Sequence, residues 1–97
     1  MRKPLPPGWR EGTVAEFLGL TPAEEAVIEI GLKLADLVKA RRAELGLTQK
    51  ELAERMGTTQ PHVCDLEHGA SRLDTVIRAF LALGGSRAEL AAAIAET

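Results

Sequence analysis

The chain has 97 residues, a formal net charge of −2 at neutral pH and only 3% aromatic residues. This length fits one small domain with a modest core, and the abundance of Ala, Leu and Glu favours an all-helical fold. No apolar run reaches the roughly 18–20 residues that span a bilayer, and no signal-peptide core is evident, so a cytoplasmic protein without membrane contact is expected. A single cysteine offers no disulfide framework.

Residues 1–12, M-R-K-P-L-P-P-G-W-R-E-G, contain three prolines and two glycines. Because this composition disfavours a helix, it predicts an extended N-terminal arm. Trp9 is a candidate anchor on a protein partner or a second subunit, since Trp is enriched among interface hot spots. The alternative is a disordered tail whose Trp9 folds back onto the body of the protein.

Residues 13–18 are predicted to form a short helix that ends at Gly19. Thr13 and Glu16 have the spacing of a capping box, in which each side chain accepts from the other residue's backbone N–H. The small apolar face of this helix consists of Val14, Phe17 and Leu18. Phe17 is, with Trp9, a candidate contact for a protein partner.

A long helix of about 22 residues is predicted to begin at Pro22, because no helix breaker follows before Gly46. Thr21 and Glu24 form a second capping box at its start. Apolar residues fall on two sides of the helix: Val27, Ile30, Leu34, Leu37 and Val38 on one, and Ile28, Leu32 and Ala35 on the other. Two apolar sides imply two packing partners, namely the rest of the domain and either the arm, a second subunit or another protein.

Residues 47–69 are predicted to form two short helices joined by a tight turn. In the first helix Thr48 is the N-cap, Glu51 completes a capping box, and the apolar side consists of Leu52, Ala53 and Met56. Gly57 ends this helix, because glycine adopts the left-handed conformation there without steric cost.

The second short helix is predicted to begin after Thr58 or Thr59, with Pro61 in its first turn and Gly69 after its end. Val63 and Leu66 face inward. A helix, a glycine-containing turn and a second helix are the layout of a DNA-binding helix-turn-helix. The alternative is a helical hairpin that only packs.

Two further helices are predicted in the C-terminal part. The helix at residues 73–83 has a core side made of Val76, Ile77, Phe80 and Leu81, and Gly84 and Gly85 end it. Ser86 and Glu89 form the capping box of the last helix. The thin apolar stripe of that helix consists of Leu90, Ala93 and Ile94.

Three pieces of the chain resemble the helix-turn-helix of the Cro/CI-type (XRE) repressors. They are R-x-x-L-G-L-T-Q-x-E-L-A from residue 42, G-T-T-Q from residue 57 and L-E-x-G from residue 66. The resemblance implies an all-α, lambda-repressor-like bundle of about six helices whose first helix is long and extended at its N-terminus. The expected organisation is an arm at 1–12, a helical extension at 13–35 and a DNA-binding domain at 36–97.

The same resemblance implies sequence-specific binding of double-stranded DNA by a homodimer that represses transcription, with neither catalysis nor a cofactor. The recognition helix would run from Thr59 to His68. Base reading is expected from Gln60, Pro61, His62 and Asp65, and phosphate contacts from Gln49, Lys50, Thr59 and Arg72. Gln pairs bidentately with adenine, and helix N-termini bind anions. Asp65 departs from the neutral or basic residue frequent in the family; it either accepts from cytosine N4 or only repels phosphate.

The resemblance also implies a buried ion pair between Arg42 and Glu67, since a charge is buried there only with a partner. A dimer interface is expected in the last two helices, at Leu81, Leu83, Leu90 and Ile94. The second stripe of the long helix, with Ile28 and Leu32, is the alternative.

The histidines and the cysteine offer little chemistry. His62 and His68 are six residues apart, which fits no metal-ligand pair on a helix, so no metal is expected. His68 is expected to cap a helix C-terminus, and His62 to contact the groove or phosphate or to lie idle at the surface. Cys64 is expected to be a small side chain at the groove, with a redox switch as the alternative.

The order of arm, E-F-L-G-L-T-P-A-E-E-A, long helix and repressor domain resembles small HigA-type antitoxins, which also bind a small basic ribonuclease toxin. Residues 11–36 contain six acids and one lysine, and this acidic block suits a basic partner. One alternative is a stand-alone XRE repressor or a restriction-modification controller protein. The second is a protein-only adaptor that has lost DNA binding.

Overall fold

The computed structural model of the chain describes residues 18–97, and within this range the chain is all-α, as predicted. The helices are α2 (Pro22–Glu44), α3 (Gln49–Met56), α4 (Gln60–Glu67), α5 (Leu73–Ala82) and α6 (Arg87–Ala95). The predicted arm with Trp9 and almost all of the predicted helix 13–18, including Phe17, lie outside the described residues. None of the described helices is both long and apolar enough to cross a membrane.

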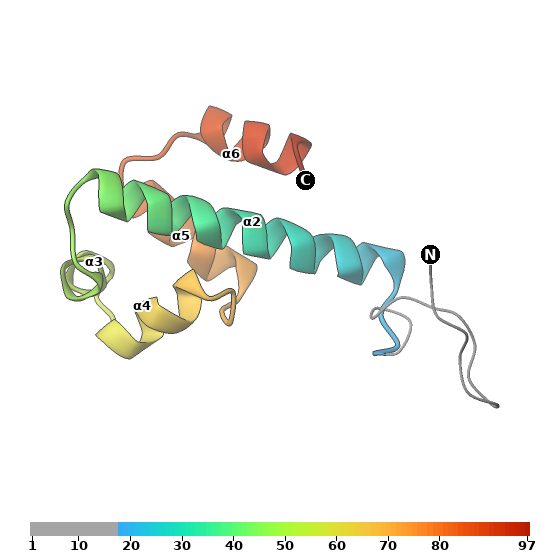
Figure 1. Ribbon diagram of the computed structural model, residues 1–97, viewed down its shortest axis with the longest axis horizontal. Coiled ribbons are helices and arrows are strands. Elements are labelled where there is room, and N and C mark those ends of the chain that lie inside the picture. The colour runs from blue at the N-terminus through green and yellow to red at the C-terminus, as the bar shows by residue number, and fades with distance from the viewer. Residues whose placement is uncertain (1–17) are drawn as a thin grey trace, which may run out of the picture.

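The long helix α2 is the axis of the molecule (Figure 1). The shorter helices gather around its C-terminal half, with α3, α4 and α5 on one side and α6 on the other. The N-terminal half of α2 projects beyond this bundle. The C-terminal half of α2 therefore belongs to the helical bundle, whereas its N-terminal half extends outside the bundle.

Local sequence signals account for the helix boundaries. The capping boxes predicted at α2, α3 and α6 are all present, with side-chain to backbone distances of 3.0–3.2 Å for Thr48 with Glu51 and the corresponding pairs. Gly57 has a φ of 68° and ends α3 in the left-handed conformation. The N-cap of α4 is Thr59, whose side chain makes no capping bond, and Pro61 follows in the first turn.

The hydrophobic core lies where the five helices meet. Its fully buried large side chains are Leu34, Val38, Leu52, Val63, Leu66, Val76 and Phe80. Each such side chain contributes roughly 1.5–3 kcal/mol when it is removed from water. Because Leu34 and Ala35 belong to this core, the globular domain includes residues on the N-terminal side of the boundary expected at residue 36.

Several apolar side chains lie elsewhere than predicted. Leu81 and Ile94 are 44% and 43% exposed, so the assignment of Leu81 to the core side of its helix was wrong. Leu83 and Leu90, expected at a dimer interface, are instead only 2% and 9% exposed. The reason is that α6 packs against α2, and this arrangement covers Leu90 within one subunit. Val27, predicted on the core stripe of α2, is 52% exposed.

Two glycines are required, one by close packing and one by its backbone conformation. A Cβ at Gly85 would overlap the ring of Phe80, a rigid group at the centre of the core. Gly69 has a φ of +78°, and a Cβ there would lie 2.5 Å from Cδ2 of Leu32. Leu32 therefore packs over the backbone after α4, although about half of it, 49%, is exposed.

Candidate nucleic-acid interface

The helices α3 and α4 form the predicted helix-turn-helix. Leu52 of α3 and Val63 and Leu66 of α4 are completely buried, and they fix both helices on the core. The opposite side of α4 faces solvent with four expected base-reading residues, Gln60, Pro61, His62 and Asp65. The fold thus presents one face of a short, firmly packed helix to an outside partner.

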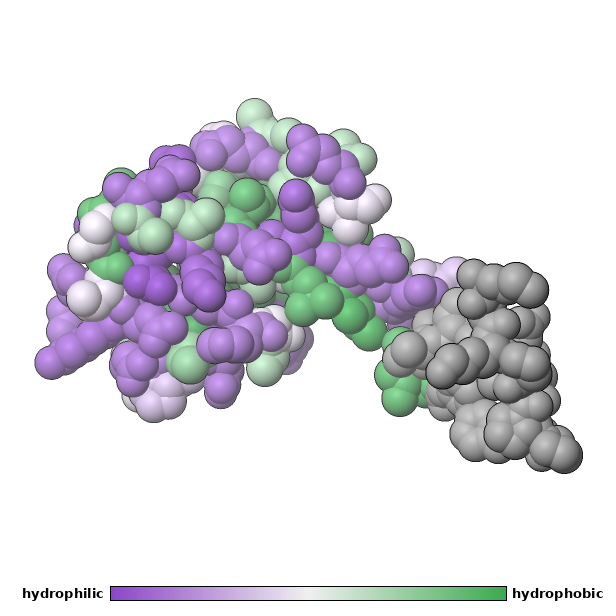
Figure 2. Space-filling model, in the orientation of Figure 1, coloured by the Kyte–Doolittle hydropathy of each residue, from purple (hydrophilic) through white to green (hydrophobic). Residues whose placement is uncertain are grey.

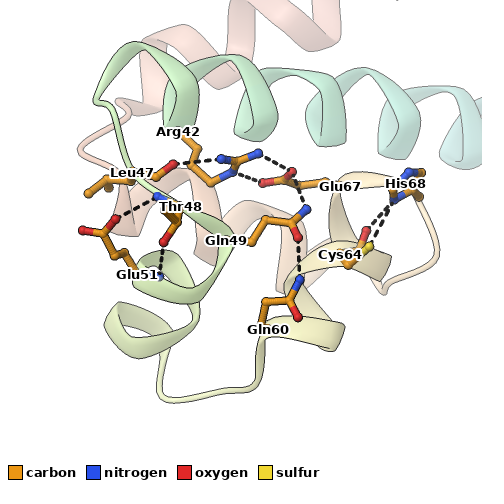
Figure 3. A network of polar contacts seen from close by, with 9 residues as sticks. All are labelled: Arg42, Leu47, Thr48, Gln49, Glu51, Gln60, Cys64, Glu67 and His68. Atoms are coloured by element: carbon orange, nitrogen blue, oxygen red, sulfur yellow. Dashed lines mark hydrogen bonds and ion pairs between the residues drawn. The ribbon is translucent and has the colours of Figure 1, made fainter.

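The ion pair expected between Arg42 of α2 and Glu67 of α4 is present (Figure 3). Arg42 Nη2 donates to Glu67 Oε1 at 2.9 Å, and Nε donates to Oε2. The third guanidinium nitrogen, Nη1, donates to the carbonyl oxygen of Leu47 at 2.8 Å. The two side chains are 16% and 1% exposed. This bidentate pair joins the end of α2, the segment before α3 and the end of α4.

The environment of Glu67 affects its protonation. Burial of the carboxyl would raise the pKa of Glu67, but hydrogen bonds from Arg42 and Gln49 and the charges of Arg42 and Lys39 outweigh burial, so this pKa lies below its ordinary value. The hydrogen bond to Glu67 raises the pKa of Arg42. Both groups are therefore charged at neutral pH.

A chain of two amides leads from this ion pair to the surface. Gln49 Nε2 donates to Glu67 Oε1 at 3.1 Å, and Gln60 Nε2 donates to Gln49 Oε1 at 2.7 Å (Figure 3). An ionised carboxylate only accepts hydrogen bonds, so Gln49 must turn its NH2 group toward Glu67 and its oxygen toward Gln60. Gln60 must then turn its own NH2 group toward Gln49.

The hydrogen bonds from Glu67 through Gln49 to Gln60 determine which polar atoms Gln60 can offer to a partner. Its Oε1 and its second N–H have no partner among residues 18–97. One acceptor beside one donor is the complement of the N6 and N7 edge of adenine. Gln49, expected only as a phosphate contact, thus also orients Gln60. Sequence reasoning missed this link, because residues eleven apart in the chain reveal their contact only in the folded turn.

The expected phosphate contacts surround α4. Lys50 lies in the first turn of α3 and Thr59 is the N-cap of α4, and both are exposed. Arg72 is the N-cap of α5, with a side chain 89% exposed and its Nε 3.5 Å from Asp74. The sequence contains no Lys or Arg between Arg55 and Arg72. Permanent positive charge therefore flanks α4 rather than lying on it.

The histidines engage in local contacts. His62 Nδ1 lies 2.7 Å from the hydroxyl of Thr58. His68 is the C-cap residue of α4, as expected, and its Nδ1 donates to the carbonyl oxygen of Cys64 at 2.7 Å. Cys64 Sγ is 3.8 Å from the same nitrogen. Residues 18–97 contain no group of three or more His, Cys, Asp or Glu side chains that could hold a metal ion.

Comparisons with known proteins agree with this geometry. A family model described as helix-turn-helix matches residues 38–90. An uncharacterized HTH-type transcriptional regulator of Methanothermobacter thermautotrophicus is 54% identical over 33 residues, which are 34% of this chain and 48% of that protein. The chain thus spans about half the length of this curated relative. No solved structure matches. Since the family match covers more than half of the chain, the protein belongs to the XRE-type helix-turn-helix family.

Proposed function

We propose that this protein binds double-stranded DNA sequence-specifically as a homodimer and represses transcription. The observation that carries the proposal is the hydrogen-bonded chain from Glu67 through Gln49 to Gln60. It holds a base-reading amide in one orientation at the start of an exposed helix. The residues at the N-terminal end of a recognition helix are those that contact base edges in the major groove.

The contacts divide into two groups. Base reading falls to the exposed face of α4, with Gln60, Pro61, His62 and Asp65. Positioning on phosphate falls to Gln49, Lys50, Thr59 and Arg72, which lie at or beside the N-termini of α3, α4 and α5, where unpaired backbone N–H groups favour anions. Affinity should fall steeply with salt, because the positive charge is local and the chain as a whole carries −2.

The test is a binding titration on an operator selected from random duplex DNA. Gln60→Ala should weaken binding to that operator by about 1–3 kcal/mol and relax preference at one base pair. Lys50→Ala should weaken all sequences alike and reduce the salt slope by about one unit. An unchanged operator affinity in Gln60→Ala would contradict the assignment of α4 as the recognition helix. Absence of any DNA binding would favour a protein-only adaptor.

A homodimer is proposed because one recognition helix makes too few base contacts for a useful specificity ratio. Two-fold symmetry would place two such helices about 34 Å apart, one turn of DNA. The exposed apolar residues of α5 and α6, Leu81 and Ile94, support an interface there, whereas Leu83 and Leu90 are needed in the core.

Light scattering should report twice the mass of one chain, and the double variant Leu81→Glu, Ile94→Glu should report monomers. Ile28→Glu, on the N-terminal half of α2, should leave the dimer intact. The reverse pattern would move the interface to α2.

A second, finer proposal is that the protein is the antitoxin of a type II toxin–antitoxin pair. The observation that favours it is the apolar surface along the N-terminal half of α2 (Figure 2), with a groove lined by Leu20, Ala23, Glu24, Val27 and Ile28. The lining includes one acid, Glu24, which gives the groove a negative charge. An apolar groove with an acidic residue in its lining suits a small basic protein such as a ribonuclease toxin.

Co-expression tests this proposal. If a neighbouring gene encodes a small basic protein that stops growth, this chain should relieve the arrest and co-purify with that protein, and Ile28→Glu should lose both effects while keeping DNA binding. A neighbouring product that neither stops growth nor binds this chain would favour a stand-alone XRE repressor or a restriction-modification controller.

A further inference from the structure

Asp65 is the exposed acid of the recognition helix. It lies in the second half of α4, and its side chain is exposed. The backbone oxygen of Asp65 accepts from the N–H groups of His68 and Ala70. Its side-chain carboxylate has neither a hydrogen bond nor an ion pair with any residue of the 18–97 range.

The stability of the fold does not explain a carboxylate at this position. A negative charge near a helix C-terminus is opposed by the helix dipole. The residues three and four positions away are Pro61, His62, His68 and Gly69, and none of them is Lys or Arg. On a surface that faces DNA the charge also repels phosphate. A hydrogen-bond donor on a base edge is the contact that would compensate for these costs.

The major groove offers two exocyclic amino groups as donors, N4 of cytosine and N6 of adenine. A carboxylate only accepts hydrogen bonds. Adenine places the acceptor N7 beside N6, so the second carboxylate oxygen would face a lone pair. Cytosine has a C–H group beside N4 and creates no such conflict. We propose that Asp65 selects a C·G base pair in each half-site, separate from the base pair that Gln60 reads.

This inference rests on the proposed DNA-binding function and assigns a base to one of its residues. The same helix would then combine an amide suited to adenine with a carboxylate suited to cytosine. Specificity would come from the amide of Gln60 and the carboxylate of Asp65 on α4, while Lys50 and Arg72 supply attraction from the sides. A neutral replacement at Asp65 should therefore change which sequence is bound and not only how tightly.

The test is selection from a random duplex pool with the wild-type chain, Asp65→Asn and Asp65→Ala. The wild type should select cytosine at one position of each half-site. Asp65→Asn, which has the same shape, should select adenine there, because Asn pairs bidentately with N6 and N7. Asp65→Ala should select no base at that position. Replacing the cytosine should weaken wild-type binding by about 5- to 150-fold, the range for one good base contact.

The matched control is Asp36→Asn, which removes the same charge from an exposed position of α2 outside the helix-turn-helix. It should select the wild-type sequence. If Asp65→Asn also selects the wild-type sequence and merely binds all DNA more tightly, Asp65 only repels phosphate and the inference is overturned. If the wild type itself selects no sequence, the proposed function fails and this assignment fails with it. Circular dichroism of each variant verifies the fold.

Discussion

The two halves of α2 have a similar spacing of apolar residues but differ in how far those residues are buried. Toward its C-terminus, Leu34 and Val38 are fully buried beneath the other helices. Toward its N-terminus, Val27 and Ile28 are 52% and 47% exposed. Both halves have apolar residues at helical spacing. They form one continuous helix, which begins at the capping box of Thr21 and Glu24. Amphipathic pattern therefore predicts the helix, but only the number of available partners decides which stretch of its apolar face is covered.

This contrast separates stability from binding. The C-terminal half of α2 belongs to the unit that holds α3 and α4, through the core and through the Arg42 to Glu67 pair. The N-terminal half contributes little to that unit and leaves apolar surface at its end (Figure 2). Substitutions of buried residues in the C-terminal half of α2 should lower stability, whereas substitutions in the N-terminal half should change the stability of the isolated protein very little.

The largest effect is expected from breaking the buried ion pair. Arg42→Ala leaves Glu67 buried without its partner, and this should lower the free energy of unfolding by about 3–5 kcal/mol. The matched control is Lys33→Ala, which removes an exposed ion pair with Glu96. In that pair the Nζ of Lys33 lies 3.8 Å from Oε2 of Glu96. That pair should contribute about 0–1 kcal/mol. Urea denaturation measures both changes, and equal losses in the two variants would refute the distinction.

The next effect compares the two halves of α2 directly. Leu34→Ala leaves a cavity in the core and should cost about 2–5 kcal/mol. Ile28→Ala removes a half-exposed side chain, and Ala favours the helix, so its effect should lie within about 0.5 kcal/mol. Thermal unfolding at fixed protein concentration gives both values. A loss in Ile28→Ala as large as that in Leu34→Ala would mean that the N-terminal half belongs to the same cooperative core.

The sequence predicted what depends on neighbours in the chain and missed what depends on tertiary packing. Local sequence patterns predicted the helix ends, because each end depends on groups within a few residues of one another. These ends are the capping boxes that begin at Thr21, Thr48 and Ser86 and the helix C-terminus at Gly57. Leu81 was misplaced because periodicity alone does not reveal which residues of α5 are buried when this helix packs against α2. The resemblance to XRE repressors supplied the pairing of Arg42 with Glu67, which spacing alone could not give.

The same limit applies to the candidate interface. Gln49 and Gln60 were both expected near DNA, but the bond between them depends on how the turn brings the starts of α3 and α4 together. The close contact between Gly85 and the ring of Phe80 also escaped prediction, because a glycine that follows a helix reads as a stop signal alone. The arm and Phe17 lie outside the described residues, so their expected roles stay predictions.

The orienting role of Gln49 leads to a smaller expected effect. Gln49→Ala removes the acceptor that holds Gln60, so it should weaken cognate binding by about 1 kcal/mol, the usual contribution of one hydrogen bond. It should also reduce discrimination at the base pair read by Gln60, whereas Lys50→Ala should leave that discrimination intact. Fluorescence anisotropy on matched and single-mismatch duplexes measures both quantities. If both variants weakened all duplexes equally, the hydrogen bond would have no part in readout.

The most gradual effect is the pH dependence of stability that Glu67 confers. The pKa of Glu67 is lowered in the folded protein, so the unfolded chain binds its proton first as the pH falls from neutral. The stabilisation is fully present above the unfolded value of about 4.3 and is lost as the pH falls through the folded pKa. Glu67→Gln should therefore be less stable than the wild type at pH 7, and the difference should narrow below pH about 4. Denaturation at a series of pH values tests this, and parallel curves for the two proteins would show that Glu67 does not titrate with unfolding.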